Sequence, residues 1–227
     1  LKKSCDIKET AGTLSALGSA YFESKKYSEA AYYCEKALKY GDTADLYNKL
    51  ALSLYEINKL RKAIEYSDKM YELYPDNVYA IILKIKSLMQ KGKLIDAEKM
   101  CVEYLKLHGE EHSTLQLWCM LGYLKELIYC DDNQAKECYK IALKLGNNDA
   151  KYNIAVSCQK LGELEEAERI YREIVELYPD SEEYRVALGM CLLQQKKFSE
   201  GYRYFSDRLN DKESKNCPKL WRTGDKI

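Results

Sequence analysis

The chain contains 227 residues, and its 36 Lys and Arg are balanced by 36 Asp and Glu, so the formal net charge is zero. This length corresponds to one large domain or two small ones. A chain without net charge lacks the long-range attraction that binders of nucleic acids or anionic membranes usually show, so we expect neither partner. Only 3 Pro and 11 Gly are present, which indicates a mostly helical chain. The 21 Tyr are unusually many.

Several cellular settings are disfavoured. The longest uncharged stretches, such as residues 113–124, are about a dozen residues long, whereas a membrane-spanning helix needs roughly 20. No apolar segment follows the basic residues at the beginning, so no signal peptide is predicted within the chain. The first residue is Leu1 and not Met, so we expect a piece of a longer chain, and a signal upstream stays open. The nine Cys are irregularly spaced, with no Cys-x-x-Cys pair, which is typical of a reduced, cytoplasmic protein.

Apolar residues recur with helical spacing along most of the chain. The first example is Leu14, Leu17, Gly18 and Tyr21, which follow the i, i+3, i+4, i+7 pattern of one helix face. Short polar turns interrupt the pattern at regular intervals. The predicted helices span residues 12–24, 27–40, 44–57, 60–73, 78–91, 94–107, 114–129, 132–145, 148–161, 164–177, 182–195 and 198–209.

Glycine and proline mark several of the predicted helix ends. Gly92 and Gly162 stand where a left-handed C-cap is expected. Pro75 and Pro179 end the second helix of a pair, because proline cannot continue the hydrogen-bond ladder. The helices therefore come in pairs, each joined by a tight turn.

The pairs belong to an internal repeat of about 34 residues. The pentapeptide Glu-Leu-Tyr-Pro-Asp occurs at 72–76 and again at 176–180, close to three repeats later. Two series of mostly small residues follow the same spacing, which indicates points where helices approach closely. The first series is Ala30, Ala63, Ala97, Ala135, Ala167 and Gly201, and the second is Gly18, Ala51, Ile85, Gly122, Ala155 and Gly189.

The repeat resembles the tetratricopeptide repeat, which carries a Leu-Gly pair, an alanine and aromatic residues at set positions. Its fourth copy shows these as Trp118, Leu121, Gly122, Ala135 and Tyr139. The resemblance implies an all-α fold, a right-handed superhelical solenoid of six helix-turn-helix repeats (an α-α superhelix), each packed on its neighbours. We expect an N-terminal flank over 1–10, the solenoid over 11–209 and an irregular tail over 210–227.

The resemblance also implies a function. In such superhelices the first helix of each repeat lines a concave groove that binds an extended peptide or a partner helix. We therefore predict a protein–protein interaction scaffold whose partner is a protein or peptide. On this chain the implied groove positions are Asn48, Leu52, Tyr55, Tyr79, Ile82, Lys86, Met89, Tyr123, Glu126, Tyr152, Val156, Gln159, Val186 and Met190.

Catalysis is not predicted. His108 and His112 fit an H-x-x-E-H pattern, but Gly109 is expected to lie beyond a helix end, and no third zinc ligand is evident. No nucleophile with a partnering base and no glycine-rich phosphate loop is present. We expect no enzymatic activity, no cofactor and no catalytic or metal-binding residue.

The end of the chain suggests two alternatives. The residues from Phe198 to Gly224, including Pro218 and Trp221, resemble the junction of bacterial fusions between tetratricopeptide repeats and glycosyltransferases. The chain would then be an acceptor-binding or regulatory region excised from a larger enzyme. In the second alternative, terminal repeats without caps associate end to end, and the chain forms oligomers. Trp221 is expected to fold back on the last helix.

Overall fold

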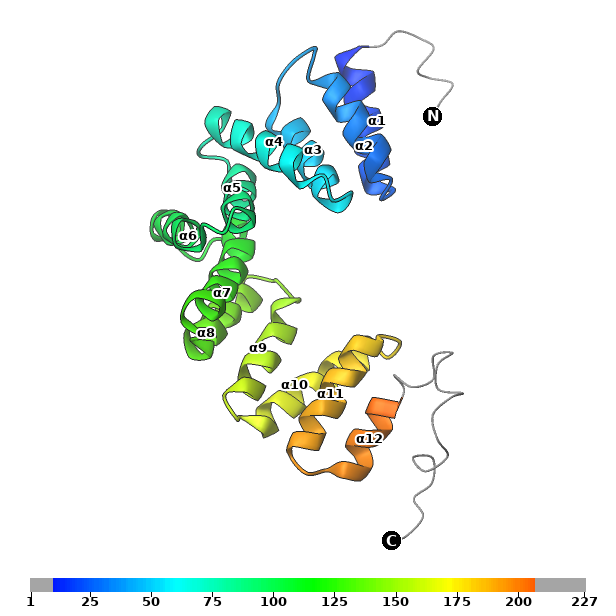
Figure 1. Ribbon diagram of the computed structural model, residues 1–227, viewed down its shortest axis with the longest axis vertical. Coiled ribbons are helices and arrows are strands. Elements are labelled where there is room, and N and C mark those ends of the chain that lie inside the picture. The colour runs from blue at the N-terminus through cyan, green and yellow to red at the C-terminus, as the bar shows by residue number, and fades with distance from the viewer. Residues whose placement is uncertain (1–9, 207–227) are drawn as a thin grey trace. The chain divides into compact units, whose positions relative to one another are not determined.

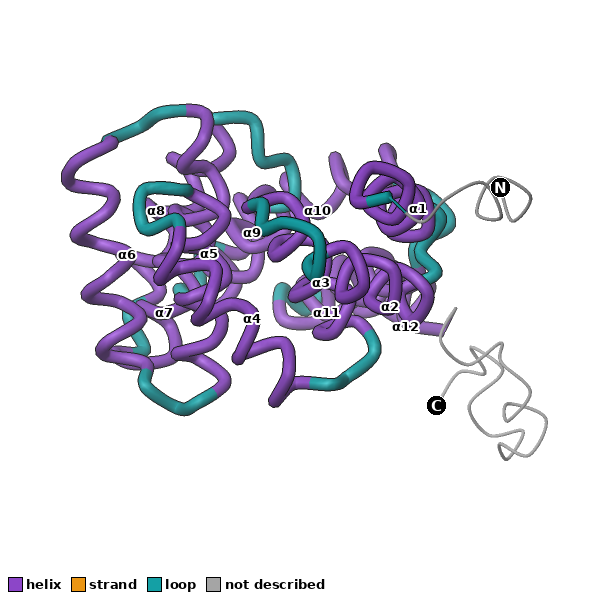
Figure 2. Tube along the Cα trace, turned by 90° about the horizontal axis from the view of Figure 1, so that it is seen from above, coloured by secondary structure: helices purple, strands orange, loops and turns teal. Residues whose placement is uncertain are grey.

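The computed structural model describes residues 10–206, which form twelve α-helices and one short 3₁₀ helix, with no strand among them (Figures 1 and 2). Every predicted helix is present, and each observed beginning lies within two residues of the predicted one. The protein is thus all-α, as expected. The flank before Thr10, the end of the predicted solenoid over 207–209, the whole predicted tail and the fold-back of Trp221 lie outside the described residues.

The chain divides into two compact parts, Leu1–Ile128 and Tyr129–Ile227. The helices of the first part are α1 Ala11–Glu23, α2 Tyr27–Ala37, α3 Ala44–Glu56, α4 Leu60–Leu73, α5 Val78–Gln90, α6 Leu94–His108, η2 His112–Thr114 and α7 Leu115–Tyr129, which ends one residue past the boundary. Those of the second part are α8 Asp132–Lys144, α9 Ala150–Lys160, α10 Leu164–Leu177, α11 Glu182–Gln194 and α12 Phe198–Ser206. The division into one solenoid domain over 11–209 stays a prediction.

Polar side chains at the N-caps explain where several first helices of the pairs begin. Thr10 and Thr13 form a reciprocal capping box at the start of α1. The hydroxyl of Thr43 accepts a hydrogen bond from the backbone of Leu46 before α3. Asn77 Oδ1 accepts one from the Tyr79 backbone at 2.9 Å before α5. Each cap satisfies a backbone N–H that the helix itself leaves without a partner.

A residue with positive φ occupies the turn inside each helix pair. Gly92 (φ 72°) and Gly162 (φ 79°) confirm the predicted left-handed caps. The other four turns use residues other than glycine, and among these only asparagine adopts this conformation readily. These residues are Lys25 (φ 56°), Asn58 (φ 57°), Cys130 (φ 51°) and Lys196 (φ 62°). Each of the six lies five residues before a member of the first small-residue series, so turn and helix contact keep a fixed register.

The predicted small residues are buried at contacts between helices. Ala30, Ala63 and Ala167 have no exposed surface, and the bulky Ile85 is fully buried as well. One hydrophobic cluster draws its side chains from α1, α2, α3 and α4, so no helix pair buries its apolar face alone. The cluster consists of Leu14, Ala31, Cys34, Ala37, Leu46, Leu50, Leu54 and Ala63.

Packing follows the chain order. Consecutive helices pack against each other within the series α1 to α6, and again within the series α8 to α12. In the first part α1 also contacts α3, and α3 contacts α5, so the first helices of successive pairs lie beside one another. Within each part the helix pairs therefore stack as in an α-α solenoid.

Partly buried carboxylates connect neighbouring helices. In the first part Asp68 on α4 accepts hydrogen bonds from Lys84 Nζ (2.9 Å), Ser87 Oγ (3.1 Å) and Lys91 Nζ (2.7 Å), three residues of α5 and its C-cap. Burial alone would raise the pKa of Asp68, but the two lysines outweigh it and hold that pKa below its ordinary value.

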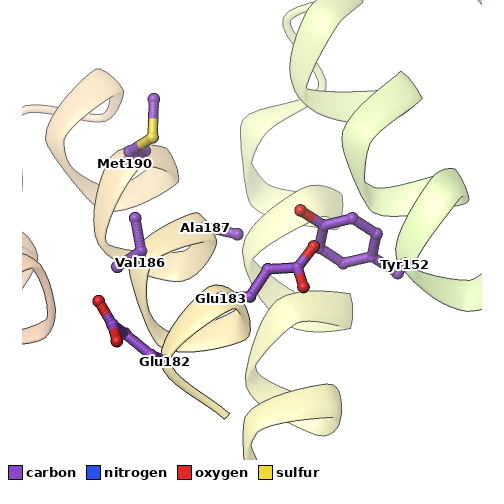
Figure 3. A pocket seen from close by; sticks show the side chains of 6 residues that line it. All are labelled: Tyr152, Glu182, Glu183, Val186, Ala187 and Met190. Atoms are coloured by element: carbon purple, nitrogen blue, oxygen red, sulfur yellow. The ribbon is translucent and has the colours of Figure 1, made fainter. Parts of the chain in front are cut away.

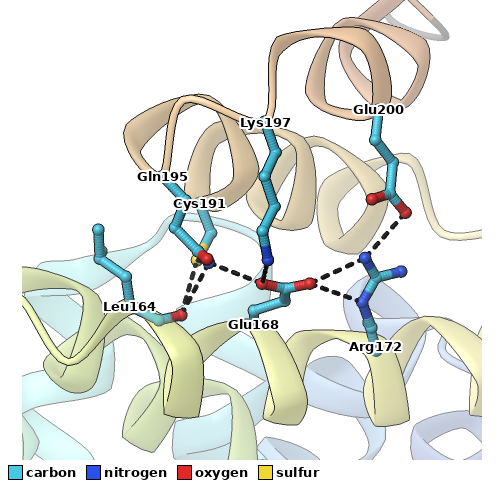
Figure 4. A network of polar contacts seen from close by, with 7 residues as sticks. All are labelled: Leu164, Glu168, Arg172, Cys191, Gln195, Lys197 and Glu200. Atoms are coloured by element: carbon cyan, nitrogen blue, oxygen red, sulfur yellow. Dashed lines mark hydrogen bonds and ion pairs between the residues drawn. The ribbon is translucent and has the colours of Figure 1, made fainter.

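Glu168 on α10 has the corresponding role in the second part (Figure 4). Its carboxylate accepts hydrogen bonds from Lys197 Nζ (2.5 Å), Gln195 Nε2 (2.8 Å) and Arg172 Nε (3.0 Å). Arg172 continues the network to Glu200 on α12 through a bond of 2.8 Å. The network fixes the turn between α11 and α12 against α10.

Candidate functional site

The predicted groove residues of the first part lie on α3, α5 and α7, the first helices of their pairs. Tyr79 and Tyr123 are exposed, with 55% and 47% of their surface accessible. Asn48, Met89 and Glu126 are partly buried. These five side chains therefore keep surface that a partner could contact.

Three predicted groove residues of the first part take part in its packing. Ile82 is only 5% exposed, so its prediction as a groove residue is wrong, because α5 is enclosed by its neighbours on most sides. The ring of Tyr55 packs against both hydrophobic clusters of this part, and Leu52 packs against one of them. Tyr55 and Leu52 thus contribute to the core as well as to the surface.

Lys86 on α5 is a partly buried cation that has no ion pair or hydrogen bond with another described residue. Its pKa is lowered, because burial disfavours the charged ammonium more than the carboxylate of Glu56 favours it. Lys86 is the only cationic residue among the fourteen that were predicted for the groove.

In the second part three predicted groove residues come together in a hollow of about 430 Å³ between α9 and α11, here called the inner hollow. Tyr152 closes it from α9, whereas Val186 and Met190 stand one turn apart on α11 (Figure 3). Met190 is 48% exposed. The remaining lining residues, which the sequence did not indicate, are Glu182, Glu183 and Ala187.

Of the other two predicted residues of α9, Gln159 connects this helix to its neighbours. Gln159 donates a hydrogen bond to Gln194 Oε1 on α11 (2.8 Å) and accepts one from the hydroxyl of Tyr171 on α10 (3.0 Å). Val156 lies partly buried between Tyr152 and Gln159 on the same face of α9. Gln159 therefore positions the walls of the inner hollow more than it offers a free amide.

A second, more enclosed hollow of about 340 Å³ adjoins the first and shares Tyr152 with it. It is named the tyrosine hollow, because Tyr152, Tyr178 and Tyr184 line it. The ring centroids of Tyr152 and Tyr184 are 5.3 Å apart, and those of Tyr178 and Tyr184 are 5.8 Å apart. The rings come from α9, the end of α10 and the first turn of α11. Asp149 lies on the wall of the hollow, directly before α9.

Carboxylates influence the tyrosines of this hollow. Burial raises the pKa of Tyr152, and the nearby Glu183 carboxylate raises it further. Burial likewise raises the pKa of Tyr184, with additional contributions from Glu183 and Asp149. Both hydroxyls therefore stay protonated at neutral pH. Figure 3 shows the Glu183 carboxylate directed toward the ring of Tyr152.

The two histidines of the H-x-x-E-H pattern lie on different elements. His108 ends α6 and stacks on the ring of Tyr104 at 4.1 Å between centroids, whereas His112 begins η2. Gly109 between them has a φ of 61° and ends the helix, as expected. Among residues 10–206, no three His, Cys, Asp or Glu side chains are grouped as a metal site would need.

Comparison with protein families identifies the repeats. Residues 10–40, 44–77 and 149–181 match family models described as tetratricopeptide repeat. These segments are the helix pairs α1–α2, α3–α4 and α9–α10. The chain therefore contains tetratricopeptide repeats.

A curated protein from two yeast strains matches part of the chain. The mitochondrial import receptor subunit TOM70 of Saccharomyces cerevisiae is 29% identical over 93 residues. The match covers 41% of this chain and 15% of the receptor subunit, so the chain spans only a small share of that protein.

Solved structures share the fold. A chain of the APC/C hetero-tetramer Cut9–Hcn1 superposes with a TM-score of 0.77 at 18% identity, over 88% of this chain and 40% of that one. PilF of Pseudomonas aeruginosa gives a TM-score of 0.71 at 18% identity, over 88% and 91% of the two chains. No helix in the part of the chain that the structure describes is long and apolar enough to cross a membrane.

Proposed function

We propose that this array of tetratricopeptide repeats is a non-enzymatic protein-binding scaffold, and that the first helices of its pairs capture an extended peptide or a partner helix. Tetratricopeptide repeats typically mediate contacts between proteins. The partial match to a subunit that is named as an import receptor is in keeping with a binding role.

The inner hollow carries the proposal. Apolar side chains of α11 form one wall, and an aromatic ring from α9 forms the other. Binding sites for side chains are usually apolar concavities with a few polar groups at the rim, which is the composition of this hollow. Tyr and Met are also residues that adapt to varied partners, because one offers a large ring with a polar end and the other a flexible chain. A peptide side chain placed in this hollow would contact both Tyr152 and Met190, which line it.

Selection from a random peptide library displayed on phage tests this proposal directly. The 227-residue chain is immobilised, enriched peptides are synthesised, and their dissociation constants are measured. The expected result is a set of peptides with apolar anchor residues, whose affinity falls about tenfold or more when Met190→Asp places a charge in the hollow, since burying an unpaired charge is costly.

Leu107→Asp is the matched control, because Leu107 on α6 is 83% exposed and lies outside both hollows. This variant should retain the peptide affinity. Equal binding of the selected peptides to the parent chain and to Met190→Asp would refute the inner hollow as their site, and circular dichroism verifies that both variants are folded.

A further inference from the structure

The tyrosine hollow has features that the binding of an apolar side chain does not require. Three tyrosines line it, and of these only Tyr152 also lines the inner hollow. The faces of aromatic rings carry negative electrostatic potential and attract cations, as in the cages that bind quaternary ammonium groups. A group of three such rings around one hollow therefore favours a positively charged occupant.

The charges around the rings point the same way. Asp149 lines the tyrosine hollow and Glu183 lines the adjoining inner hollow. Neither carboxylate has a hydrogen bond or ion pair with any residue in the described range. The single cationic side chain on the wall, Lys151, is already paired with Glu173 at 2.5 Å. Arg185 lines neither hollow, and its guanidinium donates to the carbonyl of Pro179. The side chains with unpaired charge are thus negative.

Helix dipoles do not reverse this sign. The ends of α8 and α10 and the beginnings of α9 and α11 meet at the hollow, so two negative and two positive helix termini largely cancel. Glu183 lies in the first turn of α11 and also interacts favourably with the positive end of that helix. The side chains therefore decide the potential in the hollow.

The internal repeat provides a comparison. The pentapeptides at 72–76 and 176–180 align the two halves with an offset of 104 residues. At this offset Tyr152 corresponds to Asn48 and Tyr184 to Ala80. Tyr178 corresponds to Tyr74, whose hydroxyl donates to the carbonyl of Asp42 at 3.2 Å. The helix stack can thus be built without a three-ring cage, which argues that the rings in the second part serve a ligand and not the fold.

We propose that the tyrosine hollow binds a lysine or arginine side chain of the partner peptide, next to the residue of that peptide that enters the inner hollow. This inference rests on the proposed scaffold function and specifies the chemistry of its partner. The ammonium or guanidinium group lies against the rings of Tyr178 and Tyr184, and Asp149 and Glu183 neutralise its charge. A basic residue near an apolar anchor becomes the sequence requirement for binding.

A small probe tests the site without any peptide. Nα-acetyl-lysine N-methylamide is titrated into the 227-residue chain labelled with ¹³C at its tyrosine rings, at constant ionic strength, and NMR spectra are recorded. Saturable shifts of Tyr152, Tyr178 and Tyr184 are expected. The norleucine analogue has the same methylene chain but no charge, and equal shifts with this probe, or no saturable shift with the lysine probe, would overturn the proposal.

Matched variants identify the groups involved. The double variant Asp149→Asn, Glu183→Gln keeps the size of both side chains but removes their charges. It should lower the affinity for the lysine probe about fivefold or more, because these charges neutralise the ammonium group. Glu165→Gln, on an exposed residue at the opposite end of α10, should leave the affinity unchanged. Tyr184→Leu should abolish the shifts, whereas Tyr202→Leu, on an exposed residue of α12, should retain them. Unchanged affinity in the Asp149→Asn, Glu183→Gln variant, or unchanged shifts in Tyr184→Leu, would overturn the proposal.

The peptide selection separates this inference from the function on which it rests. Replacement of each lysine or arginine in a selected peptide by norleucine should reduce its affinity about tenfold, in line with the loss of a partly desolvated cation–aromatic contact. Peptides that bind through Met190 and tolerate this replacement would refute the cation site and leave the scaffold intact. Probe binding with no peptide captured would support the cation site and refute the scaffold.

Discussion

A Cβ atom placed on Gly18 would lie 2.6 Å from Sγ of Cys34, across the contact between α1 and α2. The backbone nitrogen of Cys34 would be 3.3 Å away, so the neighbouring helix itself would have to move. The second series of small residues therefore reflects distances between helix axes. A single methyl group decides whether two helices can reach their observed separation.

Gly18→Ala should consequently destabilise the chain, by about 1–2 kcal/mol, because the overpacking outweighs the better helix propensity of alanine. Gly12→Ala is the control in the same helix. There an added Cβ would meet only Thr10 Oγ1, at 3.9 Å, so stability should stay equal or rise. Urea unfolding followed by circular dichroism measures both. A Gly18→Ala chain as stable as the parent would contradict the close contact.

Lys25→Gly should stabilise the chain, although glycine usually has the opposite effect. Lys25 has a φ of 56°, a region that costs a side chain about 1 kcal/mol or more and costs glycine almost nothing. The greater freedom of glycine in the unfolded chain offsets part of the gain, so we expect about 0.5 kcal/mol. Thermal unfolding provides the measurement. Lys36→Gly, within α2, should instead lower stability by about 1 kcal/mol, and similar losses for both variants would count against the left-handed turn.

Glu168→Gln should reduce the free energy of unfolding at pH 7 by about 1–3 kcal/mol, because three donors lose their charged acceptor. Burial alone would raise the pKa of Glu168, but Lys197, Arg172 and Gln195 together hold it below its ordinary value. The stabilisation is thus complete above the pKa of an unfolded glutamate and is lost as pH falls through the lower, folded value.

The difference in stability between the parent and Glu168→Gln should therefore shrink under acid conditions, as the parent carboxylate becomes protonated. Urea unfolding at a series of pH values from 7 to 3 measures it. Glu165→Gln, on the same helix and exposed, should differ little from the parent throughout. If the difference in free energy of unfolding between the parent and Glu168→Gln stayed constant down to pH 3, the carboxylate charge would not be what stabilises the turn.

Cys34 should resist alkylation in the folded chain. It has no exposed surface, and burial raises its pKa to about 11. Cys130 is exposed, so iodoacetamide at pH 8 should modify it first, as peptide mapping by mass spectrometry can show. An unfolded chain would ionise the Cys34 thiol near pH 9, whereas the folded chain ionises it only near pH 11. The stability that the neutral, buried thiol confers is therefore complete below about pH 9 and is lost as pH rises to about 11. Equal modification of both thiols would indicate that α1 and α2 separate readily.

The helix pairs could be predicted because the spacing of apolar and small residues reports directly on helix faces. The turns could be placed for the same reason, and Gly92 and Gly162 even indicated their conformation. The positive φ of Lys25, Cys130 and Lys196 could not be predicted, because these residues rarely adopt it. The helices on both sides impose this conformation, and no local signal in the sequence marks it.

The site was predicted less well than the fold. The repeat positions indicated Tyr152, Val186 and Met190, which do share one hollow. Ile82 was assigned to the groove, although α5 is apolar on most of its surface, a pattern typical of an enclosed helix. The tyrosine hollow was missed because Tyr178 and Tyr184 lie on two elements and near helix ends, where spacing within one helix carries no information. The unusual number of tyrosines was the only available signal.

The constant separation between the left-handed turn residue and the small residue after it has a consequence for how such a chain can change. If the chain is shortened from the turn of one pair to the turn of another, the joined pair still has a left-handed turn residue and a small residue five positions after it. Removal of residues 58–91, for example, would place Gly92 and Ala97 where Asn58 and Ala63 stand, in an unbroken register. Whole helix pairs are thus interchangeable pieces, whereas deletion of a few residues would misalign every contact beyond it. The chain can therefore change in length by whole helix pairs. Removal of residues 58–91 would leave the hollow between α9 and α11 unchanged.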